Sequence, residues 1–228
     1  RKRSNFNLQQ ISVAVSHNIH DWEIKFESDD MKNKALARMN EAIRFVLDAS
    51  DDDFKREING YIDVDSVIDY MILMYVSCAT DNYSKNAVYV TYDGLKFYMS
   101  PYDLDATWFM RWDGLAFYKE NYFLPRVSTN GQYFRPEVDN ELFYRIGELY
   151  PDLIAARYFD LRKEILTPEH IMSKFRAFTK QIPGELYETD FEKWPDIPSQ
   201  EKNTVGRTSL LVKKRMLLLD DIMSHFCQ

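Results

Sequence analysis

Apolar residues recur at three- and four-residue steps over two early segments of the chain, and this period predicts helices. The first segment, 31–49, follows Asp29 and Asp30, either of which is a suitable N-cap. The second begins at the sequence DVDS, whose carboxylates supply a cap, and runs from about Asp63 to Ala79. Because the second segment is apolar on most faces, we expect its helix to lie in the core.

Short stretches that alternate apolar and polar residues predict strands. ISVAV at 11–15 and WEIKFE at 22–27 precede the first helix. AVYVTY and LKFYMS flank Asp93 and Gly94. We expect a β-hairpin there, because Asp-Gly supplies the positive φ values of a two-residue type I′ turn.

The remainder of the chain has mostly helical periodicity, with Thr167 and Pro168 as an N-cap and first helical residue. The stretch 182–203 contains three prolines, which predicts a loop, packed by Trp194. Helical segments are predicted near 139–149, 151–166, 167–181 and 204–226. The whole pattern predicts an α+β fold, in which a small strand-rich N-terminal part precedes a mainly helical body.

Composition narrows the possible partners. With 45% hydrophobic residues among 228, the chain can bury a substantial core. Acidic residues outnumber basic ones by 36 to 29, and the net charge of −7 argues against a nucleic-acid partner. The longest apolar run, Tyr70 to Ala79, is about half of the ~20 residues that a membrane-spanning helix needs. We therefore expect no membrane span, and neither the compartment nor the oligomeric state can be predicted.

The candidate chemistry lies around the predicted hairpin. Asp81 follows the buried helix, Asn86 comes five residues later, and Asp103 follows the second strand. Protein-kinase catalytic lobes use this order, with the first Asp accepting the hydroxyl proton and the Asn and later Asp holding magnesium. Mg²⁺ prefers such hard oxygen ligands. Lys85 lies inside this segment, where it either neutralises transferring phosphate or is simply a solvated side chain.

Other interpretations of these residues stay open. Asp and Asn are common in turns after helices, where they accept backbone hydrogen bonds. The pair formed by Asp103 and Asp105 also matches the D-x-D metal site of nucleotide-sugar glycosyltransferases. That alternative is weakened because the chain lacks an obvious parallel α/β pattern.

The sequence resembles the CotH kinase-like family, named for spore coat protein H, whose members have an atypical protein-kinase fold. The matching stretches are YIDVDSVIDYMI, DNYSKNAVYV, YDGLKFYMSPYDLD and, less specifically, VKKRMLLLDDIMSHF. The resemblance implies an ATP-dependent protein kinase in which Asp81 is catalytic and Asn86 and Asp103 lie near the metal. Asp105 completes the paired-Asp signature of the family as a further metal residue.

The sequence departs from the family pattern in two places and lacks one kinase feature. Tyr102 stands where the family usually has Trp, and ATWFMRW replaces a turn that usually contains Gly. The seven glycines cannot form a phosphate-cradling G-x-G-x-x-G loop. We therefore expect residues 1–28 to be the remnant of a strand-rich N-lobe and residues 29–228 to be a helical kinase-like C-lobe.

The expected function is ATP- and Mg²⁺-dependent phosphoryl transfer to a protein hydroxyl. The alternative is a non-catalytic structural or binding module built on a kinase-like C-lobe. In that case the partner is an assembly partner rather than a protein substrate. By family resemblance, such an assembly belongs to a spore coat, another surface or a particle.

Overall fold

The computed structural model describes residues 18–19, 22–23, 31–83, 86–111, 117–128, 134–135, 140–195 and 204–227. Its helices are α1 (Lys32–Asp48), α2 (Asp51–Glu57), α3 (Val64–Ser77), α4 (Glu141–Leu149), α5 (Pro151–Arg162), α6 (Pro168–Thr179), α7 (Gly184–Lys193) and α8 (Thr204–Ser224), with short 3-10 turns η2 (Ile58–Gly60) and η3 (Thr80–Tyr83). Its strands form the antiparallel pairs β1 (Asn18–Ile19) with β2 (Trp22–Glu23), β3 (Ala87–Val90) with β4 (Tyr98–Pro101), and β5 (Arg126–Val127) with β6 (Phe134–Arg135). The α+β prediction is confirmed. The predicted strand at 11–15 lies outside the described residues.

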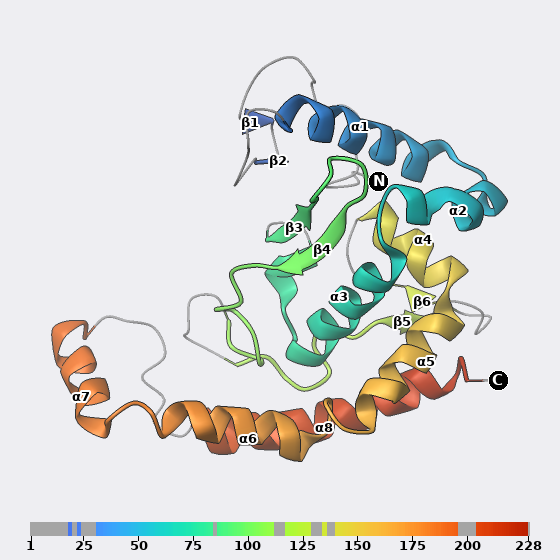
Figure 1. Cartoon of the computed structure of the whole chain (residues 1–228). Coiled ribbons are helices and arrows are strands. Elements are labelled where there is room, and N and C mark those ends of the chain that lie inside the picture. The colour runs from blue at the N-terminus through green and yellow to red at the C-terminus, as the bar shows by residue number, and fades with distance from the viewer. Residues whose placement is uncertain are drawn as a thin grey trace.

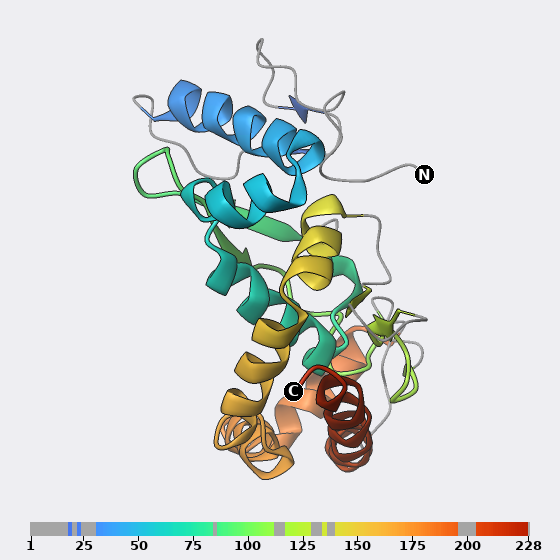
Figure 2. The ribbon, with the colours of Figure 1, turned by 90° about the vertical axis from the view of Figure 1, so that its right-hand side faces the viewer.

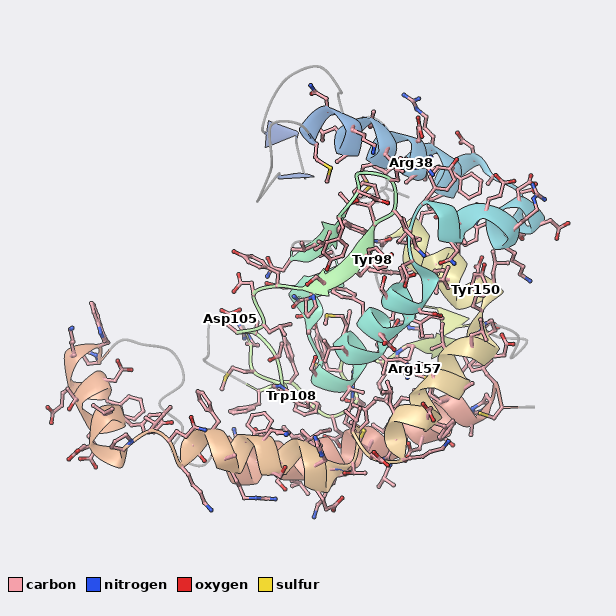
Figure 3. All side chains as sticks on the ribbon, viewed as in Figure 1. Arg38, Tyr98, Asp105, Trp108, Tyr150 and Arg157 are labelled. Carbon is pink, nitrogen blue, oxygen red and sulfur yellow. The ribbon has the colours of Figure 1, made fainter. Side chains whose placement is uncertain are left out.

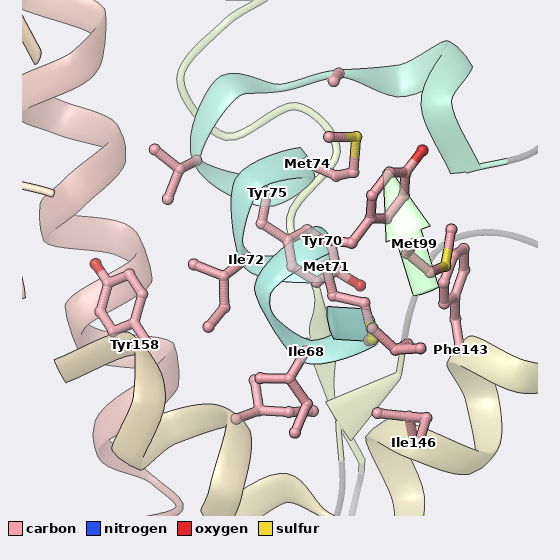
Figure 4. Packing of buried hydrophobic residues seen from close by; sticks show 14 of the residues in the cluster. Ile68, Tyr70, Met71, Ile72, Met74, Tyr75, Met99, Phe143, Ile146 and Tyr158 are labelled. Atoms are coloured by element: carbon pink, nitrogen blue, oxygen red, sulfur yellow. The ribbon is translucent and has the colours of Figure 1, made fainter. Parts of the chain in front are cut away.

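Helix α3 is the centre of the fold. It runs between α1 at one end of the molecule and α6 and α8 at the other (Figure 1). Ten of its fourteen residues are buried, and Figure 4 shows Phe143 and Ile146 of α4 and Tyr158 of α5 around it. The side chain of Asp63 accepts a hydrogen bond from the Ser66 backbone N–H at 2.9 Å, which caps the helix. The predicted buried, acid-capped helix is therefore confirmed.

Helix α1 covers the hairpin end of α3, and Figure 2 shows it lying across that end of the molecule. Its buried face carries the residues that the periodicity predicted, Met39, Ala42, Ile43 and Val46. The predicted cap was wrong. The N-cap is Met31, whose side chain accepts no capping hydrogen bond, and Asp29 and Asp30 lie outside the described residues.

Two basic side chains of α1 hold the tip of the β3–β4 hairpin. The Lys34 ammonium donates to the Asp93 carbonyl at 2.7 Å, and Arg38 Nε donates to the Leu95 carbonyl at 2.9 Å. The Arg38 guanidinium, labelled in Figure 3, also lies over the Tyr61 ring, 3.9 Å from its centre. The hairpin is thus held from above by α1 as well as from below by α3.

The hairpin is present, but its predicted two-residue turn is wrong. Val90 pairs with Tyr98, so seven residues connect the strands. Only Gly94 in this connection has a positive φ, at 71°, whereas a type I′ turn needs two such residues. The Asp93 carboxylate instead accepts from the backbone N–H groups of Leu95 at 2.8 Å and Lys96 at 3.2 Å. An Asp side chain that closes its own turn replaces the expected backbone geometry.

Most predicted helices of the second half are confirmed, including the Thr167 cap, which accepts from the His170 N–H at 3.0 Å. The predicted loop at 182–203 is wrong over α7, and Trp194 is 56% exposed rather than packed. Pro183 occupies the N-cap of α7, before the helical hydrogen bonds begin, so it starts the helix rather than breaking it. The acidic run at 51–53 forms the first turn of α2 behind the Ser50 cap, where carboxylates interact favourably with the helix dipole.

Asp220 of α8 joins α5 to α8 through two partners. It accepts from the Tyr158 hydroxyl at 2.7 Å and from Arg162 Nε and Nη2 at 2.8 and 2.7 Å. Burial raises the pKa of this carboxyl, but the hydrogen bonds from Arg162 and Tyr158 outweigh burial and lower its pKa below 3.8. A carboxylate with a lowered folded-state pKa stabilises the fold fully above its unfolded pKa and loses that effect as the pH falls through the folded value.

We predict that Asp220→Asn lowers the unfolding free energy by about 1–3 kcal/mol at pH 7, because it removes charge-assisted hydrogen bonds. The difference from the wild type should shrink as the pH falls below about 4 and the wild-type carboxylate becomes protonated. Urea unfolding across this range measures it, with Asp221→Asn as the control. A difference that stays constant with pH would contradict the prediction.

Candidate active site

Asp81 lies in a turn that leaves the end of the buried helix α3. Cys78 ends the helix in the left-handed conformation, with φ of 56°, and its backbone N–H bonds to the Met74 carbonyl. The 3-10 turn η3 follows at once and contains Asp81, which is half-buried. The position of Asp81 is therefore determined by the C-terminal end of a core helix rather than by a long loop.

The neighbouring residue Asn82 fastens this turn to the segment after β4. Asn82 is buried, and its side-chain amide donates to the Tyr102 carbonyl at 2.6 Å. Its own carbonyl accepts from the hydroxyl of Tyr70 in α3. Asn82 could not be predicted as a site residue, because the only signal in the sequence was an Asn beside the candidate Asp. An amide of this kind is informative only once its tertiary partners are known.

Asn86 and Asp103 are brought together, as the order of the motifs predicted. The Asn86 amide Nδ2 donates to the Asp103 backbone carbonyl at 3.4 Å. The Asn86 backbone N–H donates to the Asp81 carbonyl at 3.3 Å. Through these contacts the turn that holds Asp81, the start of the hairpin and the residue after β4 meet at one corner of the molecule.

Of the remaining predicted site residues, the structure describes Asp103 and Asp105 but not Lys85. Asp103 and Asp105 are both exposed on the segment that follows β4. Figure 3 labels Asp105 on this segment. Asp105 Oδ1 accepts from the Ala106 N–H at 2.8 Å, so one of its oxygens already serves the local turn. Asp103 has a left-handed backbone, with φ of 54°, which is uncommon outside glycine but tolerated by Asp. Lys85 lies outside the described residues.

The oxygen atoms at this corner suit a hard cation such as Mg²⁺. Carboxylates and amide oxygens are its preferred protein ligands, and it commonly takes only one or two of them, completed by water and phosphate oxygens. Within the described part of the chain, no group of three His, Cys, Asp or Glu residues is arranged to hold a metal by itself. The donor set at this corner therefore fits a metal shared with a phosphate ligand better than a closed protein site.

The turn after Asp105 has an unusual backbone. Trp108 and Phe109 both have positive φ, at 53° and 74°, in the stretch where the family pattern has a glycine-containing turn. The Trp108 N–H donates to the Ser77 carbonyl at the end of α3, at 2.5 Å, and the Phe109 carbonyl accepts from the Tyr118 N–H at 2.6 Å. A bulky residue in this conformation is a genuine outlier, and such strain concentrates at functional sites.

We predict that Phe109→Gly is more stable than Phe109→Ala by about 1–2 kcal/mol. Both variants lose the buried ring, but only Ala keeps the cost of a left-handed L-residue. Thermal or urea unfolding of the two variants measures the difference. The pair Phe97→Gly and Phe97→Ala, at a buried β-bridge position without positive φ, should show the usual order, with Ala more stable. An Ala variant at 109 as stable as the Gly variant would contradict the prediction.

Arg215 of α8 is the largest fully buried side chain among the described residues. Its guanidinium donates to the Tyr75 carbonyl at the C-terminal end of α3, at 2.8 Å. It also donates to the Glu120 and Phe123 carbonyls at 3.0 and 2.8 Å, and to that of Tyr122. Arg215 belongs to the basic run VKKR, and a run of this kind normally lies on an exposed helix face, but Arg215 is fully buried. Because a charged side chain is normally solvated, the sequence did not indicate that Arg215 connects the end of α3 to the 120–123 segment.

The fold and the candidate site together indicate the class of protein. The fold is α+β, and a buried helix is followed by a turn with Asp81 and Asn86, an antiparallel hairpin and Asp103, which is the order of a kinase-like catalytic lobe. The model of the family described as CotH kinase protein matches residues 4–216, which is most of the chain. The chain therefore belongs to the CotH kinase family, and its fold is kinase-like. No curated protein matches the sequence.

The helices that the structure describes include none that is both long enough and apolar enough to cross a membrane. α3, the most apolar candidate, has fourteen residues, fewer than the ~20 that a span requires. This agrees with the expectation from its sequence.

Proposed function

We propose that this protein transfers the γ-phosphoryl group of ATP to a hydroxyl group of a protein substrate, with magnesium as the metal. The observation that supports the proposal is the pair of contacts made by Asn86. Its side-chain amide donates to the Asp103 carbonyl, and its backbone N–H donates to the Asp81 carbonyl. These contacts bring together the three residues that the kinase-like order assigns to phosphoryl transfer, in a chain of a kinase family.

In this proposal Asp81 orients the acceptor hydroxyl and accepts its proton. The role suits a carboxylate in a short turn at the end of α3, because orientation requires a rigid support. Asn86 and Asp103 hold the metal, and Asp103 is the principal carboxylate because the kinase order places the metal Asp directly after the hairpin. Asp105 assists with the oxygen that does not serve the Ala106 N–H. Magnesium, when bound, neutralises charge on the phosphate oxygens.

Lys85 and residues 1–28 also have roles in this proposal. Lys85 lies between Asp81 and Asn86 in the chain, and its ammonium supplies positive charge to the transferring phosphate. Residues 29–228 form the C-lobe that carries this site, and residues 1–28 belong to a strand-rich N-lobe. The β1–β2 pair at 18–23 supports a strand-rich character for that part.

The second candidate is a binding or structural module without catalysis. Its support is the 108–109 turn, where Trp108 and Phe109 replace the usual glycine and Phe109 is fully buried. A turn anchored by such packing is less able to adapt to a ligand than a glycine turn. In this reading the partner is a member of a surface or particle assembly. The D-x-D glycosyltransferase alternative loses ground, because every strand pair in the described residues is antiparallel.

We predict that Mg-ATP raises the melting temperature and that Asp103→Ala removes the shift. Ligand at 100 times its Kd stabilises a protein by about 2.7 kcal/mol, which is on the order of 5–10 °C for a chain of this size. Asp105→Ala should reduce the shift less than Asp103→Ala does. Differential scanning fluorimetry with ATP alone, Mg²⁺ alone and both together measures it. Asp152→Ala, exposed at the start of α5, is the control.

The result also assigns the two carboxylates. A larger loss with Asp105→Ala would reverse the assignment of the principal ligand. A shift that survives in both variants would remove this corner from the metal site. The absence of any shift in the wild type would favour the non-catalytic module.

We predict that Asp81→Asn lowers phosphoryl transfer by about 10²–10⁴-fold while leaving the Mg-ATP thermal shift intact. Asn keeps the size and turn-forming ability of Asp but removes the charge, so the fold should be unchanged. Transfer of labelled γ-phosphate to the protein itself or to a generic protein acceptor measures it. Asp93→Asn, which changes an Asp in a turn away from the site, is the matched control. Equal transfer by wild type and Asp81→Asn would contradict the role of Asp81.

A further inference from the structure

Helix α7 stands apart from the rest of the described structure. It projects beyond α6, away from the core helix α3 (Figure 1). None of its ten residues is buried. An isolated helix of fewer than ~12–15 residues is marginal in water, because nucleation is unfavourable and packing normally supplies the stability. α7 therefore requires a surface on which to pack.

The aromatic side chains of α7 indicate the kind of surface on which it can pack. Tyr187, Phe191 and, directly after the helix, Trp194 follow at steps of four and three, which places them along one stripe. Tyr187 and Trp194 are exposed, and Phe191 is half-buried. Glu188 and Asp190 lie on either side of that stripe at 100° per residue. The helix carries four carboxylates and one lysine, and none of those carboxylates forms an ion pair with a described residue. Its complement is an apolar stripe flanked by positive charge.

Helix α8 presents such a stripe on its outer face. Leu210 and Leu217 are 56% and 69% exposed, and their spacing of seven places them one above the other. Lys213 and Lys214 are exposed and lie on the two sides of this line. Lys213 supplies the positive charge on one side, and Lys214 on the other also forms a surface ion pair with Glu120 at 3.6 Å. The opposite face of α8 carries buried residues such as Val212 and Met216 that pack into the core. The leucine stripe is thus separate from the packing that holds α8 in place.

We propose that the protein forms a two-fold dimer in which α7 of each copy packs on the leucine stripe of α8 in the other. The two surfaces match in both chemistry and charge, since an acidic aromatic helix meets a basic aliphatic one. Within one copy they do not meet, because both leucines and Trp194 are exposed. A two-fold axis makes the contact twice, which doubles the area that one short helix can bury. A stable interface needs roughly 1,000 Å² in total. This inference is independent of the proposed catalysis.

Charge reversal on each helix tests the dimer in the full chain. One variant carries Glu188→Lys and Asp190→Lys on α7. The other carries Lys213→Glu and Lys214→Glu on α8, together with Glu120→Lys, which keeps an ion pair between positions 120 and 214. Each variant alone has like charges on both partner surfaces, so we expect its dimerisation to be at least ~10-fold weaker than that of the wild type. An equimolar mixture restores opposite charges at both contacts and should form a heterodimer.

Sedimentation velocity measures all of these species, and circular dichroism checks that each variant is folded. The control is Lys174→Glu with Lys180→Glu, a reversal of two exposed lysines of α6 and its end that should leave dimerisation unchanged. A monomeric wild type would overturn the proposal. In that case the surface on which α7 packs would belong to a different, basic partner. Dimers that persist in either single-helix variant, or a mixture that stays monomeric, would overturn it as well.

Discussion

The contact between Arg215 and the end of α3 is the constraint on which the rest of the structure depends. Burying a guanidinium is costly unless its donors are satisfied, and here the Tyr75, Glu120, Tyr122 and Phe123 carbonyls accept them. The carbonyl at the end of α3 is a favourable partner, because a helix C-terminus carries partial negative charge. One side chain thus connects α8, the 120–123 segment and the helix end that leads directly to Asp81.

The candidate site extends this arrangement with amide side chains. Asn82 reaches from the turn after α3 to Tyr102, and Asn86 reaches from the start of the hairpin to Asp103. The Trp108 N–H returns to the Ser77 carbonyl of α3. The first and third connections have one partner within a few residues of the end of α3, and the second is tied to the same turn through the hydrogen bond from the Asn86 N–H to the Asp81 carbonyl. Asp81 and Asp103 are therefore positioned by a common support, although they are 22 positions apart in the sequence.

Sequence patterns could predict the features that depend on local chemistry. The apolar run and the acidic cap predicted α3, and the alternating residues predicted the hairpin. The position of Asp81, Asn86 and Asp103 around that hairpin predicted that they lie at one corner of the molecule. Arg215 and Asn82 were missed because their value lies in partners that are distant in sequence. The turn at Asp93 was mistaken because a side chain that bonds its own backbone competes with the type I′ geometry. The α7 segment was predicted to be a loop because prolines flank it, but Pro183 occupies the N-cap, where proline is tolerated.

The backbone of the 103–109 segment shows how rigidity at this site is obtained. Asp103, Trp108 and Phe109 all have left-handed conformations. Asp tolerates this conformation, but it costs about 1–2 kcal/mol each for Trp108 and Phe109. Full burial of the Phe109 ring contributes about 1.5–3 kcal/mol, and the Trp108 ring packs edge-on against Phe175 at 5.4 Å. Packing of this size can hold the segment in a conformation that the backbone alone disfavours. A glycine in the same turn needs no such support, so this chain combines the kinase-like order of residues with a turn stabilised by its aromatic core.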